Sequence, residues 1–134
     1  MNPETQGLHT HYTLLCDDVR LEVGNRLSLI GMFQSIVTEQ LPISLIKLAV
    51  ITYWHGQGTG SSEVRVVSPD RSEVIVESNP TPIDLPAGGF THNLTLFVTV
   101  ALPAAGVYLV QTLLDSEVVS EVPFEVVLHR HDVD

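Results

Sequence analysis

The stretch DDVRLEVGNRLSLIGMF, residues 17–33, decides the fold. It holds two runs, 19–23 and 27–30, in which apolar and polar side chains alternate, a pattern typical of a β-strand with one buried face. Gly24 and Asn25 lie between these runs. Both residue types tolerate a positive φ, so the pair predicts a tight reversal between two antiparallel strands.

The same stretch predicts two departures from regular strand geometry. Apolar side chains occupy even positions up to Cys16 and odd positions from Val19 onward. A strand cannot change faces without a bulge or a break, so we expect one at Asp17–Asp18. Gly31 lies within an apolar run, 27–37, that we expect to form one strand. Its missing side chain predicts a second bulge or the close approach of another backbone.

The rest of the chain continues this pattern. No segment combines helical periodicity with helix-forming residues over the roughly 10 residues that a typical helix needs. Turn signals at regular spacing separate short β-branched runs. We therefore expect an all-β fold, a single antiparallel two-sheet β-sandwich of about eight strands. The expected strands are 9–23 with its break, 27–37, 46–54, 64–66, 74–76, 94–102, 107–114 and 118–128.

Glycine and proline predict the connections and the domain limits. Residues 55–62 hold three glycines and are expected to be a loop, whereas the proline-rich residues 79–89 suit a crossover between sheets. Pro123 predicts an edge position or a bulge in the last strand. We expect one sandwich domain over 9–128, a flexible N-terminal arm at 1–8 and a polar C-terminal tail at 129–134.

The charge balance excludes some partners. The 134 residues carry 6 Lys and Arg against 16 Asp and Glu, a formal net charge of −10. Such a surface repels phosphate backbones and anionic lipids, so we expect neither nucleic acid nor membrane as a partner. Cys16 is the one cysteine, which fits a reducing compartment, and the first ten residues lack the basic and apolar regions of a secretion signal. We expect a cytoplasmic protein.

Three pieces of the chain resemble known sequences when taken together. Residues 17–33 resemble the opening motif of an uncharacterised bacterial family of small β-sandwich proteins. The VRVVSPD segment supplies the middle hairpin, and residues 102–127 resemble the final hairpin of immunoglobulin-like modules, with Gly106, Tyr108 and Asp115 at the typical places. The resemblance covers nearly the whole chain and implies an immunoglobulin-like fold. It supplies no catalytic residue, because that family has no assigned activity.

The immunoglobulin-like resemblance implies roles for two aromatic residues. A tyrosine at the position of Tyr108 can bond its hydroxyl to a nearby loop backbone and lock the corner of the sandwich. Trp54 resembles the core tryptophan of that architecture. The disulfide that accompanies this tryptophan in antibody domains is impossible here, since Cys16 has no partner.

Paired histidines are the sharpest candidate for chemistry. His9 and His11 lie two residues apart, as do His129 and His131. Residues i and i+2 of a strand share a face, so each pair can present two imidazoles to one metal ion, and all four can meet if the first and last strands are neighbours. The alternative is that all four are solvated surface side chains near the chain ends. Whether they meet in space does not follow from the sequence.

The other candidates favour structural roles. Asp17 and Asp18 can serve a cation such as calcium if a bulge brings them together, but they also suit a charged bulge that discourages edge pairing. The glycines of 56–60 lack the Lys-Ser/Thr of a phosphate loop, and Cys16 has no basic neighbour to activate it. No Gly-x-Ser-x-Gly motif occurs. We therefore expect no catalytic, cofactor-binding or metal-binding residue.

An apolar surplus favours an interaction role. Several runs carry apolar residues on both faces, which suggests that another subunit or the 79–89 segment covers one outer face. The first hypothesis is a non-catalytic module that self-associates or docks on a protein. The alternative is a small-ligand or carbohydrate-binding module that uses a sheet face with Tyr53 and His55. A metal-dependent enzyme that uses the paired histidines ranks third.

Overall fold

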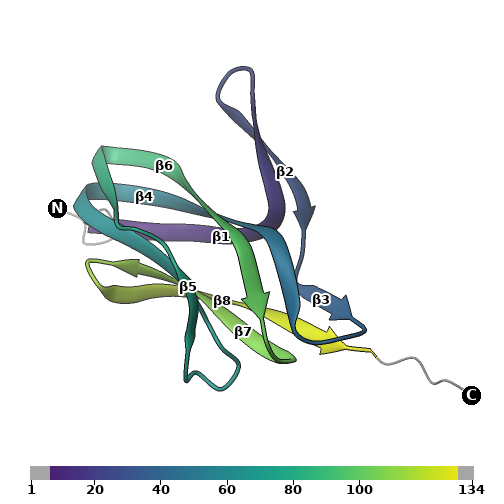
Figure 1. Ribbon diagram of the computed structural model, residues 1–134. Coiled ribbons are helices and arrows are strands. Elements are labelled where there is room, and N and C mark those ends of the chain that lie inside the picture. The colour runs from purple at the N-terminus through teal and green to yellow at the C-terminus, as the bar shows by residue number, and fades with distance from the viewer. Residues whose placement is uncertain (1–6, 130–134) are drawn as a thin grey trace, which may run out of the picture.

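Eight β-strands form the fold in the computed structural model, which describes residues 7–129 (Figure 1). No helix occurs within that range, so none there is long and apolar enough to cross a membrane. The all-β fold and the strand number are as expected. The strands are β1 (Gly7–Glu22), β2 (Arg26–Met32), β3 (Ser35–Thr38), β4 (Ile43–Val67), β5 (Val74–Glu77), β6 (Thr81–Leu102), β7 (Gly106–Leu114) and β8 (Glu117–Leu128).

The strands form one mixed sheet in the order β2-β1-β4-β7-β8-β3, with β5 and β6 also paired to β4. All pairs are antiparallel except β3 and β8, which run parallel over 35–38 and 125–128. The expectation of a purely antiparallel fold is therefore wrong. The predicted strand 27–37 divides at Phe33 and Gln34, where the chain leaves β2 and crosses to β8, and the Gln34 carbonyl accepts a bond from the Glu125 N–H at 3.0 Å.

β4 is the longest strand, and it passes through residues expected to form a loop. Its first part pairs with β1 and β6, and its last part pairs with β7 and β5. The register shifts between Gly56 and Gly58, which have φ of 122° and 129°. A side chain at Gly56 would collide with the carbonyl of Gly7. The glycines therefore bend the strand instead of ending it, because β6 remains paired with β4 on both sides of them.

β6 likewise includes most of the segment expected to be a crossover. Residues 81–85 pair with 58–62 of β4. Pro82 is tolerated because β6 pairs with β4 alone among the strands of the described chain, so a missing N–H on its open side removes no ladder bond. Further along, Thr99 has φ of 54° and the strand changes faces there: Val98 is exposed whereas Val100 is fully buried.

Both hairpin turns singled out in the sequence are present. Gly24 and Asn25 adopt φ of 80° and 59° between β1 and β2. Between β4 and β5, the Arg71 N–H donates to the Ser68 carbonyl at 2.9 Å. Pro123 lies where β8 has β7 on one side only, because β3 joins it from Glu125 onward.

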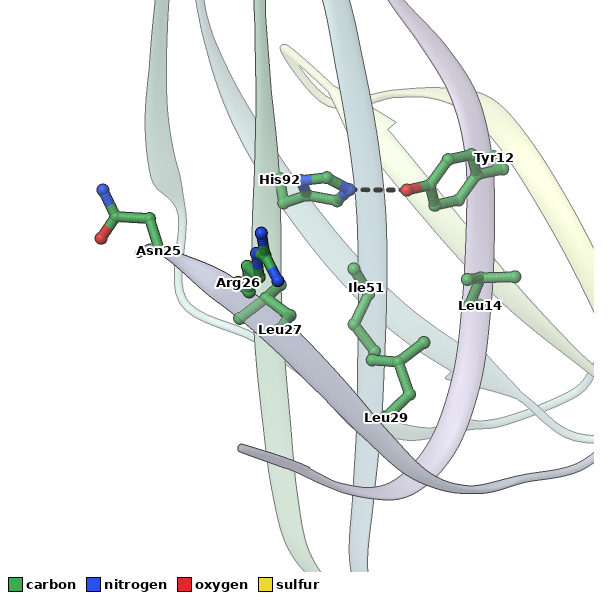
Figure 2. A pocket seen from close by; sticks show the side chains of 8 residues that line it. All are labelled: Tyr12, Leu14, Asn25, Arg26, Leu27, Leu29, Ile51 and His92. Carbon is green, nitrogen blue, oxygen red and sulfur yellow. Dashed lines mark hydrogen bonds between the residues drawn. The ribbon is translucent and has the colours of Figure 1, made fainter. Parts of the chain in front are cut away.

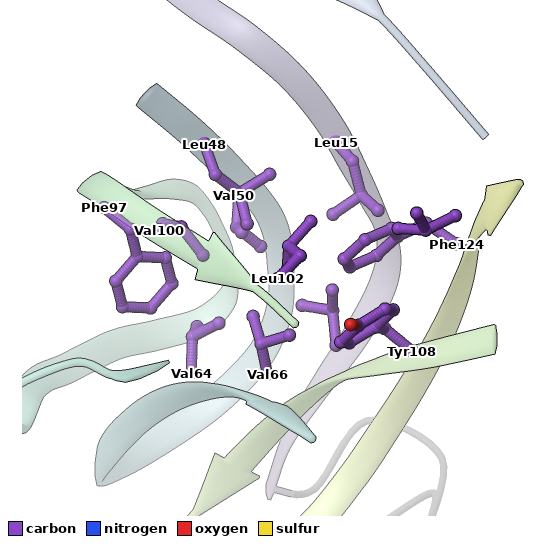
Figure 3. Packing of buried hydrophobic residues seen from close by; sticks show 12 residues of the cluster. Leu15, Leu48, Val50, Val64, Val66, Phe97, Val100, Leu102, Tyr108 and Phe124 are labelled. Carbon is purple, nitrogen blue, oxygen red and sulfur yellow. The ribbon is translucent and has the colours of Figure 1, made fainter. Parts of the chain in front are cut away.

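The core forms where the two parts of β4 face each other (Figure 3). Leu48 and Val50 of the first part and Val64 and Val66 of the second part belong to one buried cluster. Tyr108 stacks on Phe124 in the same cluster, with ring centroids 5.2 Å apart. The bend of β4 thus brings both of its parts to one apolar core, to which β1, β6, β7 and β8 also contribute.

Tyr108 and Trp54 are both fully buried. The Tyr108 hydroxyl donates to the Ala104 carbonyl at 2.7 Å and accepts from the Ala104 N–H at 3.2 Å, which confirms its expected bond to a loop backbone. Trp54 packs in a separate cluster with Leu8 and Ile83. Leu8 belongs to β1, which begins two residues before the expected start; residues 1–6 of the expected arm lie outside the described part.

Candidate functional site

The strands β1, β4 and β6 lie side by side, and we call them the β1–β4–β6 layer. The candidate site lies on its outer face, the face turned away from the core around Leu48 and Val50. Residues directly opposite each other in neighbouring strands share a face, so the register defines rows across this layer. The four rows, each in the order β1, β4, β6, are His9–His55–Phe90, Tyr12–Tyr53–His92, Leu14–Ile51–Leu94 and Cys16–Ala49–Leu96.

Aromatic and histidine rings gather around Tyr53 in the first two rows. The Tyr53 ring lies 5.2 Å from Tyr12, 4.7 Å from His92 and 6.2 Å from Phe90, measured between centroids. The Tyr12 hydroxyl bonds to the His92 Nε2 at 2.6 Å, across β4. His11 joins this cluster because it is the extra residue of a bulge in β1, which the regular i, i+2 expectation did not include.

His9 and His11 do not meet His129, the described member of the other histidine pair (Figure 1). His9 and His11 each lie 5.6 Å from the ring of His55. The end of β8 lies at the opposite end of the molecule from the start of β1, and there the His129 N–H donates to the Thr38 carbonyl (Figure 1). His131 lies outside the described residues. Within 7–129, no three His, Cys, Asp or Glu side chains are placed to hold a metal ion.

The strand segments that form this face contain no carboxylate. Residues 9–16, 48–57 and 89–98 include neither Asp nor Glu, although the chain has 16 of them. Histidines at positions 9, 11, 55 and 92 are the basic side chains of these segments. The face is therefore an uncharged or weakly cationic area on a strongly acidic protein.

The β1–β2 hairpin folds over part of this face. Val19 and Leu29 of the hairpin pack on Cys16, Ala49 and Ile51, which are at most 1% exposed. Burial raises the pKa of the Cys16 thiol, which favours its protonated form. The hairpin thus covers part of the apolar surplus noted in the sequence, whereas the 79–89 segment, one of the two covers considered there, is mostly strand.

We expected a bulge or a break at Asp17–Asp18. The register of β1 and β2 does not shift there, so the bulge is wrong, but the ladder is interrupted, because Cys16 pairs with Met32 and Asp18 with Ile30 whereas Asp17 and Gly31 form no pair. β1 leaves β4 after Cys16 and continues with β2 as a two-stranded ribbon, and such ribbons twist strongly. This twist turns Val19 toward the cluster of Cys16 without an extra residue.

Asp18 has a cationic partner within the chain. Its carboxylate accepts from the Val19 N–H at 2.9 Å and pairs with Lys47 at 3.3 Å, and these contacts lower the pKa of the Asp18 carboxyl. The Asp17 carboxylate instead lies where a side chain at Gly31 would be. Gly31 has φ of 70°, so its predicted irregularity is present, with a side chain rather than a backbone as the close neighbour.

A cleft of about 390 Å³ opens between the hairpin and the sheet (Figure 2). Its floor comes from β1, β4 and β6, and its overhang comes from the hairpin strand β2. The Tyr12–His92 bond lies at one side of the floor. The lining residues are Tyr12, Leu14, Asn25, Arg26, Leu27, Leu29, Ile51 and His92.

An apolar stripe on β6 runs beside this cleft. Its members project from alternate positions of the outer face, beyond the reach of the hairpin. They are Phe90, 68% exposed, Leu94, 45%, Leu96, 47%, and Val98, 64%. We call these four residues the β6 stripe. The neighbouring β4 residues Ala49 and Ile51 are buried under the hairpin, so the stripe is the exposed margin of the part of the face that the hairpin covers.

The sequence identified part of this site. Tyr53 and His55 were selected as exposed residues of a sheet face, and both belong to the ring cluster. Phe90 and His92 were missed because 79–89 was taken for a connection, which left their strand starting at 94. Their signal is the alternation of apolar or aromatic side chains at even positions from 90 to 98. Nothing in the sequence placed Arg26 beside them, since this depends on the fold of the hairpin.

Solved structures with the same fold come from proteins of different activities. A Pseudomonas fluorescens alkylpurine DNA glycosylase, bound to DNA containing an abasic site analogue, matches with a TM-score of 0.58 and 10% identity over 91% of this chain. A Listeria innocua β-glucosidase in complex with glucose matches with a TM-score of 0.51 and 11% identity over 93%. The match spans only 31% and 16% of those two chains, so the likeness concerns the fold alone.

No curated protein sequence matches this chain. A family model does match, over residues 11–127, which includes the hairpin motif, the ring cluster from His11 onward and the closing hairpin. The chain therefore belongs to the family of unknown function DUF6941.

Proposed function

We propose that this protein is a non-catalytic module that self-associates through the β6 stripe. The fold we propose for it is an immunoglobulin-like β-sandwich. In this proposal β4 bends, and β6 follows it, so that the part of the mixed sheet around β1 faces the part around β7 and β8. We also propose a bacterial, cytoplasmic protein, on the resemblance of residues 17–33 and on the single buried cysteine.

The observation that carries self-association is the exposure of the stripe. Four large apolar side chains on one strand are each 45% to 68% exposed. Contiguous exposed apolar area of this kind marks interaction surfaces in soluble proteins. β6 is also an open edge, because among the described strands it pairs with β4 alone. An open edge offers N–H and C=O groups for pairing with a second chain.

Charge favours a second copy of this chain as the occupant. Two chains of net charge −10 repel each other over most of their surfaces. The segments 9–16, 48–57 and 89–98 of this face contain no carboxylate, so it is the area where two copies can approach with least repulsion. Lys47 lies opposite Val98 and already pairs with Asp18, so the stripe itself offers no charged group to a partner recognised through salt bridges.

The test is the oligomeric state at micromolar concentration, measured by light scattering after gel filtration. We expect a dimer for the wild type and a monomer for Leu96→Glu, which places a carboxylate in the middle of the stripe. Val119→Glu is the matched control, because Val119 is 44% exposed against 47% for Leu96 but lies on β8. It should remain dimeric.

A monomeric wild type would overturn self-association, and docking on a different protein would then be the interpretation to test. If both variants became monomeric, the stripe would not be the interface. A circular dichroism spectrum like that of the wild type shows for each variant that the fold is kept.

A second function, small-ligand binding, is favoured by the cleft and the adjoining rings. Tyr53 is packed among Tyr12, His92 and Phe90. Rings of this kind offer flat apolar surfaces, and the cleft beside them has the volume of a small-molecule site. This candidate is developed below, since the cleft indicates the chemical class of ligand.

A further inference from the structure

The cleft under the β1–β2 hairpin has apolar walls on two sides. Leu14 and Ile51 line it from the sheet, and Leu27 and Leu29 line it from the hairpin (Figure 2). Its volume of about 390 Å³ lies in the range of roughly 300–1,000 Å³ that small-molecule sites occupy. These walls suit an aliphatic or aromatic body.

One side of the floor offers a hydrogen-bond donor. Tyr12 and His92 share a bond of 2.6 Å between the hydroxyl and Nε2. If the hydroxyl donates, the neutral imidazole carries its proton on Nδ1; if Nε2 donates, the hydroxyl proton is free. In either tautomer the pair retains one proton to donate to a bound molecule.

Arg26 is the charged residue of the cleft. The lining includes no Asp or Glu, and Arg26 makes no ion pair or hydrogen bond with any side chain among residues 7–129. Even Glu22, its cross-strand partner, is not bonded to it. A guanidinium presents a fork of N–H donors that matches a carboxylate with two parallel bonds.

We propose that this cleft binds a small apolar carboxylic acid. The carboxylate is held by Arg26 and receives the spare proton donor of the Tyr12–His92 pair, while the body lies against Leu27, Leu29 and Ile51. The proposal develops the second function above and does not require self-association, because the β6 stripe lies outside the cleft lining.

The test is a calorimetric titration with 3-phenylpropionate and with its uncharged analogue 3-phenylpropionamide. We expect saturable binding of the acid with Kd below about 10 mM, and at least tenfold weaker binding of the amide, since a charge-assisted bidentate pair contributes that much. Arg26→Ala should weaken the acid by about tenfold or more and leave the amide unchanged.

Arg20→Ala is the matched control, because Arg20 lies on the same hairpin and does not line the cleft. Its affinity for the acid should stay within about twofold of the wild type. Repeating the titration with Leu96→Glu separates the two proposals, since a monomer that still binds the acid supports the cleft even if the stripe has another role. No binding of the acid, equal binding of acid and amide, or equal effects of the two arginine variants would overturn the proposal.

Discussion

At the scale of single residues, Tyr108 ties the core to a loop. Its hydroxyl both donates to and accepts from Ala104, and the side chain is fully buried. We expect Tyr108→Phe to lower the free energy of unfolding by about 1–3 kcal/mol, because it leaves two backbone groups without their partner. Urea denaturation measures this, with Tyr12→Phe as a control that should cost less than about 0.5 kcal/mol at its exposed position. Equal losses in the two variants would show that the buried bond contributes nothing special.

The same scale shows what a sequence can and cannot specify about residues. The role of Tyr108 could be predicted because the loop that its hydroxyl meets, at Ala104, is only four residues away in the sequence. The histidines could not, since a single extra residue at His11 changes which rings share a face. His55 and His92 reach the cluster through pairings between distant strands, and such pairings depend on the register of the whole sheet.

At the scale of elements, the β1–β2 hairpin depends on Gly31. Gly31 and Gly88 have nearly the same φ, 70° and 71°, but a side chain at Gly31 would meet the Asp17 carboxylate, whereas the space around Gly88 is open. We expect Gly88→Ala to cost roughly 1 kcal/mol of unfolding free energy from backbone strain, and Gly31→Ala clearly more. Thermal or urea unfolding of both variants measures the difference. The double variant Gly31→Ala with Asp17→Ala should recover most of the excess; no recovery would mean that the carboxylate is not the obstacle.

Glycine and proline misled the prediction of elements in a physically clear way. Both residues usually end strands, so 55–62 and 79–89 were expected to be connections. In the structure, the glycines of 56–58 bend β4 while its neighbour β6 continues, and Pro82 lies on an open strand edge. Whether such a residue ends a strand or bends it depends on the partners beside it, which local sequence does not contain.

At the scale of the whole molecule, the all-β fold and the number of strands followed from alternation and turn signals alone. The parallel pairing of β3 with β8 did not, because it joins residues 35–38 to 125–128 across most of the chain. The cleft has the same origin: the hairpin motif was evident at once, but its position over the β1–β4–β6 layer is a property of the folded chain. Surface function was therefore less predictable than fold class.

At the scale of the whole molecule, the net charge should also make the proposed dimerisation depend on salt concentration. Two chains of −10 repel each other at long range, while the β6 stripe between them is apolar. Salt screens the repulsion, since the Debye length falls from about 30 Å at 0.01 M to about 10 Å at 0.1 M. We expect the dimer Kd to fall by roughly tenfold over this range. Sedimentation velocity measures it, and Leu96→Glu should stay monomeric throughout. A Kd that rises with salt would mean that ion pairs hold the two chains together, which an uncharged stripe cannot provide.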